Sequence, residues 1–398
     1  MEILLLIGLV LIAGQVGANL LRLVKIPQVV GYILMGAILG ESVLGWIEPG
    51  SLEEVTSIAL GLIGFTIGSQ LKFYQLRKLG RSILWVSIFE AFGAFLLVCI
   101  GVLILTGEPF KALVFGALAS ATAPAATVDV LQEYRCKGPL TTTLLAVVGI
   151  DDGIALVIYG FAEPFGKMLF QPEQGLTIIH SLLVPLRELG GSVLLGLVLG
   201  VVFSWSIKYF KLPGEQLSVT LAAVLIASGI AVHFHFSLIL TNMVIGLSVG
   251  NLLPRRTRRL SEIVTGFTPP VYILFFALVG ARLDVSLLPA MGWLGLTYLI
   301  ARTVGKFGGS YLGAVIGGAP KVVKRYLGLG LFSQAGVAIG LSIAVSQDFA
   351  TAGEEGIAFG NLVINTITAT TFVVQMIGPS LTRMAVFKAE EAREPGGK

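Results

Sequence analysis

The 398-residue chain carries little charge: Asp, Glu, Lys and Arg make up 13% of it, whereas a soluble domain holds about 25%. This scarcity excludes a soluble globular protein, and without a basic soluble domain the net charge of +4 does not indicate a nucleic-acid partner. The two cysteines, Cys99 and Cys136, provide neither a disulfide framework nor a metal spacing. His233 and His235 also lack the spacing of helical metal ligands. We therefore expect an integral membrane protein without a resident cofactor.

What the chain has instead is a series of apolar runs about 20 residues long without strand-like alternation, which indicates membrane helices rather than a barrel. The fifty glycines fit close packing of helices in lipid. The predicted fold is an all-α polytopic membrane protein, with 174–187 as an interfacial lead-in to the seventh span. Hydropathy places about thirteen spans near 2–24, 27–47, 52–71, 82–106, 110–133, 139–163, 188–210, 217–236, 238–253, 267–282, 286–317, 326–347 and 357–384.

The basic residues between these spans predict the orientation. Seventeen lysines and arginines lie in the odd-numbered loops, and four lie in the even-numbered loops. Because basic residues concentrate on the cytoplasmic side, the N-terminus is expected outside and the C-terminus inside a prokaryotic plasma membrane. The four exceptions are Lys111, Lys167, Arg187 and Arg282.

Two of the spans contain residues that interrupt a helix. The fifth holds Pro124 within the segment 120–129, and the twelfth is rich in glycine around Ser333 and Gln334. Interrupted helices at bilayer depth occur where they line protein or a water-filled cavity. Because the two spans are seven apart, the triplets 4–6 and 11–13 would have opposite orientations, as an inverted repeat with two broken crossing helices. Ordinary kinks at both positions are the alternative.

Two adjacent aspartates, Asp151 and Asp152, lie inside the apolar sixth span. A single carboxylate at bilayer depth costs about 2.5–3.5 kcal/mol even on a mild scale, and each charge makes ionisation of its neighbour harder. A chain that keeps such a pair is expected to hold a cation or a proton there. The other charges predicted within the membrane are Glu90, Asp129, Arg302 and Lys306.

Lys306, on the eleventh span, is the natural partner of the aspartate pair. A buried lysine and a buried aspartate each favour the charged form of the other, and adjacent helical residues point about 100° apart. One aspartate can therefore face Lys306 while the other faces a cavity. A lysine that only neutralises an aspartate is the alternative, Glu90 is a candidate partner for Arg302, and Asp129 could be a solvated helix cap.

The sequence at this point resembles a known family. Residues 26–40, Ile-Pro-Gln-Val-Val-Gly-Tyr-Ile-Leu-Met-Gly-Ala-Ile-Leu-Gly, are similar to the second-helix signature of the monovalent cation:proton antiporter-2 family. The Asp-Asp pair and the Gly-Lys-x-x-Gly of residues 305–309 resemble its electrogenic sodium/proton antiporter branch. The resemblance implies that Asp152 is the principal ion ligand, that Asp151 pairs with Lys306, and that Thr122 lies at the crossing.

The sequence departs from this pattern at two positions. Ala123 follows the threonine where the family often has an acidic or small polar residue, so the third oxygen ligand of Na⁺ is left to Thr127, Asp129, free carbonyls or water. The charged residue usual in the twelfth span is absent, with Gln334 nearby. Potassium-carrying relatives usually lack the double aspartate and carry a cytoplasmic nucleotide-binding domain. The Asp pair, with no such domain in this sequence, favours sodium.

The resulting hypothesis is a secondary active antiporter, not an enzyme, that exchanges cytoplasmic Na⁺ or Li⁺ for external protons. Residues 1–385 would form one transporter unit in the lipid bilayer, with a moving core near 82–163 and 286–384, a scaffold that forms a homodimer, and a short cytoplasmic tail at 386–398. The alternatives are a K⁺/H⁺ antiporter, a sodium-coupled organic-anion symporter of the same fold, or a channel or intramembrane aspartyl protease. The protease is disfavoured because its dyad comes from two helices.

Overall fold

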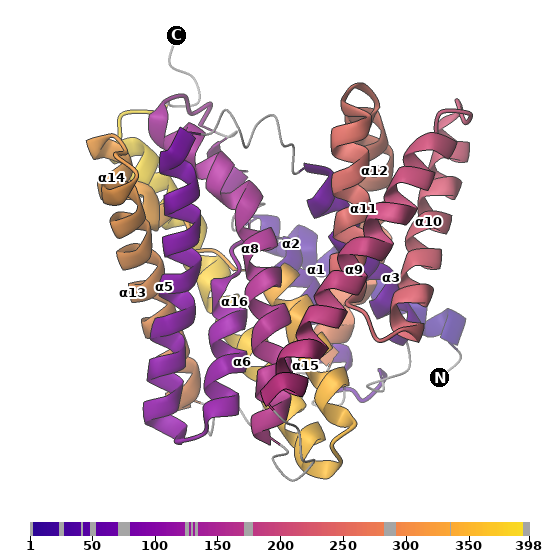
Figure 1. Ribbon diagram of the computed structural model, residues 1–398, viewed down its shortest axis with the longest axis horizontal. Coiled ribbons are helices and arrows are strands. Elements are labelled where there is room, and N and C mark those ends of the chain that lie inside the picture. Colours follow the sequence, from indigo (N-terminus) through magenta and orange to yellow (C-terminus); the bar gives the residue numbers. More distant parts are fainter. Residues whose placement is uncertain are drawn as a thin grey trace. The chain divides into compact units, whose positions relative to one another are not determined.

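The computed structural model is helical throughout the part of the chain that it describes, with one isolated bridge between Gly40 and Ile47 (Figure 1). The described residues are 3–23, 28–40, 43–47, 53–70, 80–123, 127–128, 130–131, 134–170, 178–281, 292–334 and 336–392. They form the helices α1 (Ile3–Leu23), α2 (Gln28–Leu39), α3 (Glu53–Gln70), α5 (Gly80–Thr106), α6 (Pro109–Ser120), α8 (Pro139–Phe170), α9 (Ile178–Ser206), α10 (Pro213–His233), α11 (Leu238–Leu252), α12 (Pro254–Ala281), α13 (Gly292–Ile316), α14 (Lys321–Gly330), α15 (Gly336–Ala350) and α16 (Glu354–Lys388).

Seven of these helices are long and apolar enough to cross a membrane: α1, α5, α8, α9, α10, α12 and α16. Large apolar side chains lie on the outside, as Leu4, Ile104 and Leu194 do. A water-soluble protein seldom exposes so much contiguous apolar surface, whereas lipid covers it at no cost. The chain is therefore a polytopic helical membrane protein.

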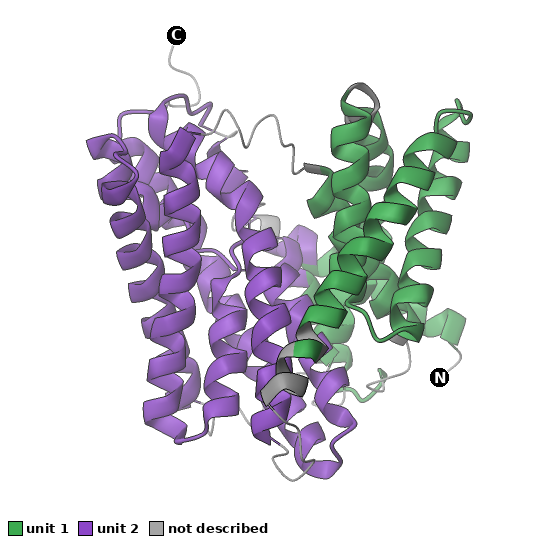
Figure 2. Ribbon diagram, in the orientation of Figure 1, with its two compact units in different colours: residues 1–17, 32–78, 173–281 green, residues 18–31, 79–172, 282–398 purple. Residues whose placement is uncertain are grey.

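The chain divides into two compact units (Figure 2). Unit 1 comprises residues 1–17, 32–78 and 173–281, and unit 2 comprises residues 18–31, 79–172 and 282–398. Within unit 1, α3 packs on α11, and α2 packs on α12 so closely that a Cβ on Gly40 would lie 2.5 Å from Ala281 Cα. The four-residue spacing of Gly36 and Gly40 thus marks a close helix contact.

Unit 2 has its closest helix pair in α5 and α13. A Cβ on Gly305 would lie 2.5 Å from the carbonyl oxygen of Gly93, and a Cβ on Gly93 would lie 2.6 Å from the carbonyl oxygen of Gly305. Only glycine permits this approach at both positions. The consequence is that the charged side chains of α13 lie directly against α5.

Two non-helical segments of unit 2 position the site, one directly after α6 and one directly after α14. α6 ends at Ser120, and Ala121 has an extended backbone at φ −67°, ψ 143°. α14 ends at Gly330, and residues 332–334 are non-helical before α15 begins at Gly336. The backbone N–H of Ala123 donates to the carbonyl of Ser333 at 2.9 Å, so the two non-helical segments contact each other.

The interfacial lead-in predicted at 174–187 is helical from Ile178 as part of α9, and the stretch of α9 that is apolar enough to cross a membrane begins at Leu186, close to the predicted start of the seventh span. Two boundaries differ from the sequence prediction. α12 begins at Pro254, so the basic run 255–259 opens a helix rather than filling a loop. The tail predicted at 386–398 begins too early: α16 continues to Lys388, and Glu391 beyond it is buried.

Candidate ion-binding site

Lys306 lies at the centre of a buried ionic cluster in unit 2. α13 carries it, its side chain has no solvent exposure, and its Nζ is 2.7 Å from Glu90 Oε2 and 3.1 Å from Asp151 Oδ2. The same ammonium donates to Thr122 Oγ1 at 2.8 Å and to the carbonyl of Ser120. Two carboxylates, a hydroxyl and a helix-terminal carbonyl therefore surround one lysine.

The structure separates the two adjacent aspartates of α8. Asp151 is fully buried and faces Lys306. Asp152 is 3% exposed, and its Oδ1 has no hydrogen-bond partner among the described residues. The rotation of about 100° between neighbouring helical residues accounts for the two directions. Asp151 Oδ1 and Glu90 Oε1 also lack a hydrogen-bond partner, but both of those residues are ion-paired with Lys306. Asp152 is thus the carboxylate of this cluster that forms no ion pair among the described residues.

The four terminal carbonyls of α6 all receive donors. A helix leaves its last four carbonyls without intrahelical partners, which is costly inside a membrane. Ser120 Oγ donates to Ala117 O at 2.6 Å, and each of the remaining three carbonyls accepts a hydrogen bond from a side chain of α13 or of the segment after α14. These donors are Gln334 Nε2 to Leu118 at 2.8 Å, Arg302 Nε to Ala119 at 3.2 Å, and Lys306 Nζ to Ser120.

Arg302 joins the two non-helical segments. It is 1% exposed, and its guanidinium donates to Phe332 O at 2.7 Å, Ala121 O at 2.9 Å and Ser333 O at 3.4 Å, besides Ala119 O. A cation is favoured at the C-terminal ends of helices, where carbonyls point outward. From the sequence, Glu90 was the candidate partner of Arg302. In the structure Glu90 pairs with Lys306 instead, because α5 and α13 approach each other closely.

Three further polar residues complete this region. Thr127 Oγ1 donates to Gly330 O at 2.8 Å, which ties the segment after α6 to the end of α14. Gln334 Nε2 also contacts the hydroxyl of Tyr298 at 2.8 Å, and Gln375 Nε2 donates to the carbonyl of Gln334 at 2.8 Å. Sequence reasoning missed Tyr298 and Gln375, which carry no charge. Asp129 lies outside the described residues.

The formal charges of this cluster do not cancel. Glu90, Asp151 and Asp152 carry three negative charges when ionised, whereas Lys306 and Arg302 carry two positive charges. A net buried charge is expensive in a low-dielectric interior, so the third carboxylate calls for a proton or a cation. In the part of the chain that the structure describes, no group of three His, Cys, Asp or Glu side chains converges as a metal centre would require.

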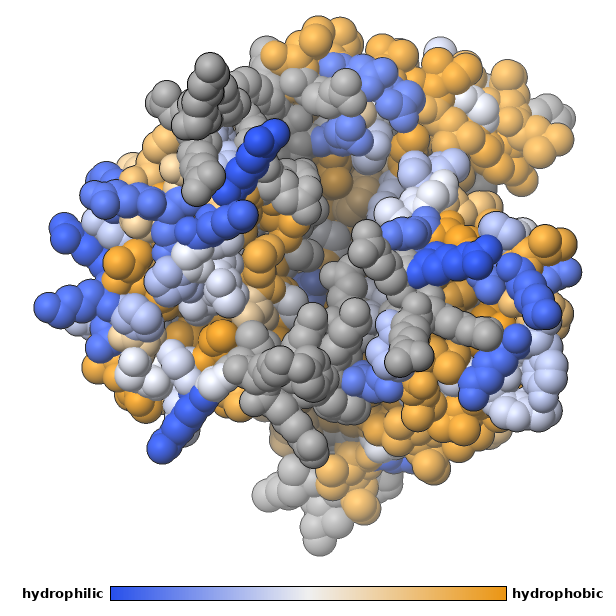
Figure 3. Space-filling view, turned by 90° about the horizontal axis from the view of Figure 1, so that it is seen from above, coloured by the Kyte–Doolittle hydropathy of each residue, from blue (hydrophilic) through white to orange (hydrophobic). Residues whose placement is uncertain are grey.

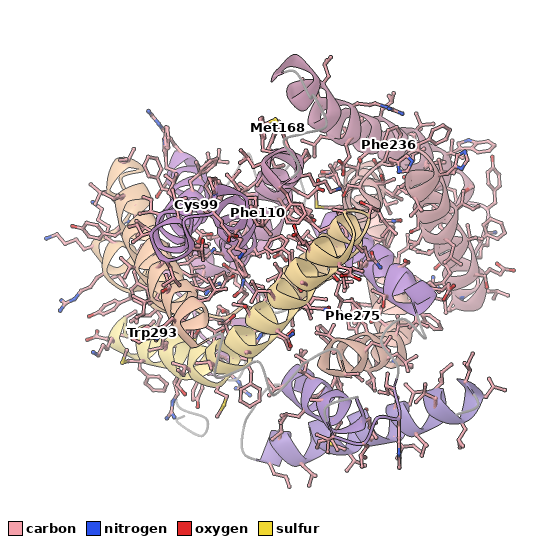
Figure 4. The ribbon with its side chains drawn as sticks, turned by 90° about the horizontal axis from the view of Figure 1, so that it is seen from below. Cys99, Phe110, Met168, Phe236, Phe275 and Trp293 are labelled. Carbon is pink, nitrogen blue, oxygen red and sulfur yellow. The ribbon has the colours of Figure 1, made fainter. Side chains whose placement is uncertain are left out.

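A second ionic group lies near the other end of α8. Glu163, 3% exposed, pairs with Lys167 one turn later, and Lys167 Nζ is 3.7 Å from Asp348 Oδ1 on α15. Four phenylalanine rings form an aromatic cluster in unit 2, with edge-on or stacked contacts and centroids 4.9–6.2 Å apart: Phe110, Phe170, Phe349 and Phe359. Figure 4 looks onto this end of the molecule and labels Phe110, one of the four. The i,i+4 spacing of Glu163 and Lys167 could have revealed the pair in the sequence.

A helical membrane protein that encloses buried charges beside two non-helical segments has features expected of an ion transporter. The family model for the transmembrane part of sodium/hydrogen exchangers matches residues 7–388. The chain therefore belongs to the sodium/hydrogen exchanger family. This agrees with the family-level resemblance found in the sequence, and assignment to the electrogenic branch stays a prediction.

Relatives and solved structures agree with this membership. A Na⁺/H⁺ antiporter of Enterococcus hirae is 24% identical over 354 residues, which cover 85% of this chain and 88% of that protein. The Na⁺/H⁺-K⁺ antiporter GerN of Bacillus cereus is 24% identical over 373 residues, covering 87% and 90%. The sodium proton antiporter MjNhaP1 of Methanocaldococcus jannaschii superposes with a TM-score of 0.74 at 20% identity, over 98% of this chain and 99% of that one. The relatives are transporters rather than enzymes.

Proposed function

We propose that the protein is a secondary active antiporter that exchanges Na⁺, or Li⁺, for protons across a prokaryotic plasma membrane. The observation that carries this proposal is the third buried carboxylate, Asp152, whose Oδ1 has no partner among the described residues. Membership of the exchanger family and the Na⁺/H⁺ antiporters among the relatives support it. Oxygen ligands suit a hard monovalent cation, and the same carboxylate oxygens can hold a proton instead.

In this proposal Asp152 binds either the cation or a proton, and competition between them couples the two fluxes. Thr122 Oγ1 and Asp151 lie on the side of the site that Lys306 occupies, and each could turn to the cation when the ammonium moves away. Ala123 contributes only its backbone, so the remaining oxygens come from carbonyls, water or Asp129. No step requires a cofactor.

Electrogenic exchange needs a second proton for each Na⁺. Lys306 Nζ has two carboxylate partners, Glu90 Oε2 at 2.7 Å and Asp151 Oδ2 at 3.1 Å, which form one ionic set with it. We propose that the second proton belongs to this set. Proteoliposomes with an imposed membrane potential test the idea. Lys306→Gln is expected to abolish the voltage dependence of exchange, and voltage dependence that persists unchanged would exclude Lys306 as a proton carrier.

Alternating access would move unit 2, which contains the site, while unit 1 forms the scaffold and the homodimer contact. The inverted repeat of the fourth to sixth and eleventh to thirteenth predicted spans would supply the two crossing segments. The basic end of unit 2 would face the cytoplasm. Figure 3 looks onto the end from which α5 and α8 begin, where hydrophilic side chains gather. Exposed basic residues of unit 2 near these helix ends include Arg135, Lys137, Lys321, Arg325 and Lys388.

The decisive experiment is proton flux in proteoliposomes driven by gradients of Na⁺, Li⁺ or K⁺. Asp152→Asn should lose cation-driven proton movement, whereas Glu355→Gln, which removes an exposed carboxylate at the start of α16, should keep it. Retained exchange in Asp152→Asn would refute the proposal. Flux driven by K⁺ alone would favour the alternative of a K⁺/H⁺ antiporter, which the similarity to GerN, a Na⁺/H⁺-K⁺ antiporter, also suggests. Uptake of a labelled organic anion with Na⁺ would indicate a symporter.

A further inference from the structure

The segment that follows α16 contacts the beginning of α8. Glu391, three residues beyond the end of α16, is 8% exposed although it is charged. Its Oε1 accepts the backbone N–H of Leu140 at 2.7 Å, and its Oε2 accepts the backbone N–H and the hydroxyl of Thr141 at 2.7 and 2.8 Å. The backbone N–H of Lys137 donates to the carbonyl of Glu391 at 3.0 Å. One residue therefore makes four hydrogen bonds to a segment about 250 positions earlier.

These bonds account for the whole first turn of α8. Helices begin with backbone N–H groups that lack intrahelical partners, and a side chain at the N-cap usually accepts them. Pro139 has no N–H, and Thr142 N–H donates to Gly138 O at 3.0 Å. The remaining two donors, Leu140 and Thr141, are those that Glu391 accepts. A residue from the far end of the chain thus takes the place of a local cap.

Gly138 is matched to this arrangement. A Cβ at Gly138 would lie 2.5 Å from Glu391 Cγ, so the Ser, Thr or Asp side chains that normally cap helices cannot occupy this position while Glu391 is in place. The carboxylate also lies at the positive end of the helix dipole, where an anion is favoured. A local cap would satisfy the same donors without joining two helices. Gly138 and Glu391 together therefore replace a local N-cap of α8 by a connection between α8 and the end of α16.

The link continues a packed interface. Ala385 and Val386, in the last turn of α16, belong to the same buried apolar cluster as Leu140 and Leu144 of α8. α8 is also the helix that carries Asp151, eleven residues and about 16 Å beyond Leu140. Any tilt or axial shift at the first turn of α8 is transmitted along a continuous helix to the aspartate pair.

We propose that Glu391 is a positioning residue for ion binding: it fixes the first turn of α8 to the end of α16, so that Asp151 and Asp152 keep their alignment with Lys306. Glu391 touches no ion and acts through α8. The inference rests on the proposed function, because it takes Asp152 as the cation ligand. It adds that Glu391, beyond the end of α16, contributes to ion binding through α8.

The test uses the full-length protein in proteoliposomes and records three quantities: Tm, the maximal exchange rate and the Na⁺ concentration for half-maximal exchange. Glu391→Gln keeps the shape but replaces one acceptor oxygen by a donor. It should lower Tm by about 2–4 °C, the shift of roughly a 1 kcal/mol loss in a domain of 150–250 residues. It should also change half-saturation by about threefold or more, because small misplacements of ligands are costly. The control is Glu390→Gln. Because the side chain of Glu390 is exposed, this variant should change neither Tm nor the Na⁺ concentration for half-maximal exchange.

A double variant separates positioning from capping. Gly138→Asp with Glu391→Ala supplies a local carboxylate cap in the space that Glu391 vacates but does not restore the link to α16. Positioning predicts that Tm recovers while half-saturation stays shifted. Recovery of both, or a Glu391→Gln protein with lowered Tm and unchanged half-saturation, would overturn the proposal and leave Glu391 as a cap. Failure of the proposed function is distinct, because it appears as wild-type protein whose exchange does not depend on Asp152.

Discussion

Arg302 offers the sharpest test of how the two non-helical segments of unit 2 are held together. Its guanidinium is buried and donates to Ala119 in the last turn of α6, to Ala121 just after α6, and to Phe332 and Ser333 on the segment after α14. We consider Arg302→Met, which keeps an unbranched apolar stem and removes every donor. The carbonyls would then be left at the ends of α6 and α14 without water to replace the lost bonds.

The magnitude follows from the two short contacts, at 2.7 and 2.9 Å. A hydrogen bond to a charged group contributes about 1.5–3 kcal/mol, so their loss should lower the free energy of unfolding by about 3–6 kcal/mol. The contacts at 3.2 and 3.4 Å are too long to add much. Arg302→Lys keeps the charge but directs its donors from a single nitrogen, so about half of the loss, on the order of 1.5–3 kcal/mol, is expected.

The assay is unfolding of the purified protein in detergent, followed by denaturant and by temperature, with folded protein measured by size-exclusion chromatography. Arg259→Met is the matched control, because Arg259 is exposed and makes one contact of 3.4 Å to the carbonyl of Lys211. Arg302→Met should be far less stable than this control. If the two variants unfold within about 0.5 kcal/mol of each other, the guanidinium does not hold the two segments together.

Two further predictions concern packing in unit 2. Gly305→Ala places a methyl group 2.5 Å from the carbonyl of Gly93 and should destabilise the protein by about 1–3 kcal/mol or more, whereas Gly308→Ala, which meets nothing within 4 Å, should be neutral; equal Tm values for both would contradict the close contact of α5 and α13. Phe359→Ala removes the ring that lies 4.9 and 5.1 Å from those of Phe349 and Phe110, and should cost about 3–5 kcal/mol in denaturant unfolding; a loss under about 1 kcal/mol would show that the aromatic cluster is not a core.

The helices could largely be predicted from the sequence, because long apolar runs separated by basic loops leave little choice in a membrane. The helix ends that the hydropathy prediction misplaced are those where the helix extends past the apolar run into charged residues. α12 opens with four arginines between 255 and 259, and α9 includes Arg187. Hydropathy ends a span at such residues, whereas the backbone continues to satisfy its own hydrogen bonds.

The candidate site was predictable where charge itself is the signal. Asp151, Asp152 and Lys306 stand out because an apolar span tolerates few ionisable residues. The pairing of Asp151 with Lys306 was expected from the sequence, but the second partner, Glu90, was not, since its pairing with Lys306 depends on how closely α5 approaches α13 at Gly93 and Gly305. The role of Arg302 was hidden for a related reason. Its partners are backbone carbonyls, which exist at every residue and leave no trace in the sequence.

The occupied carbonyls at the end of α6 have a consequence for leakage. A helix terminus with free carbonyls would attract any small cation that reached it, and such a site could pass ions without exchange. Here the ammonium of Lys306 already fills that position, with oxygens from Ser120, Thr122 and Asp151 around it. The ammonium of Lys306 thus occupies the position beside these oxygens where a small cation would otherwise bind. An ion attracted to these carbonyls would have to compete with the ammonium of Lys306.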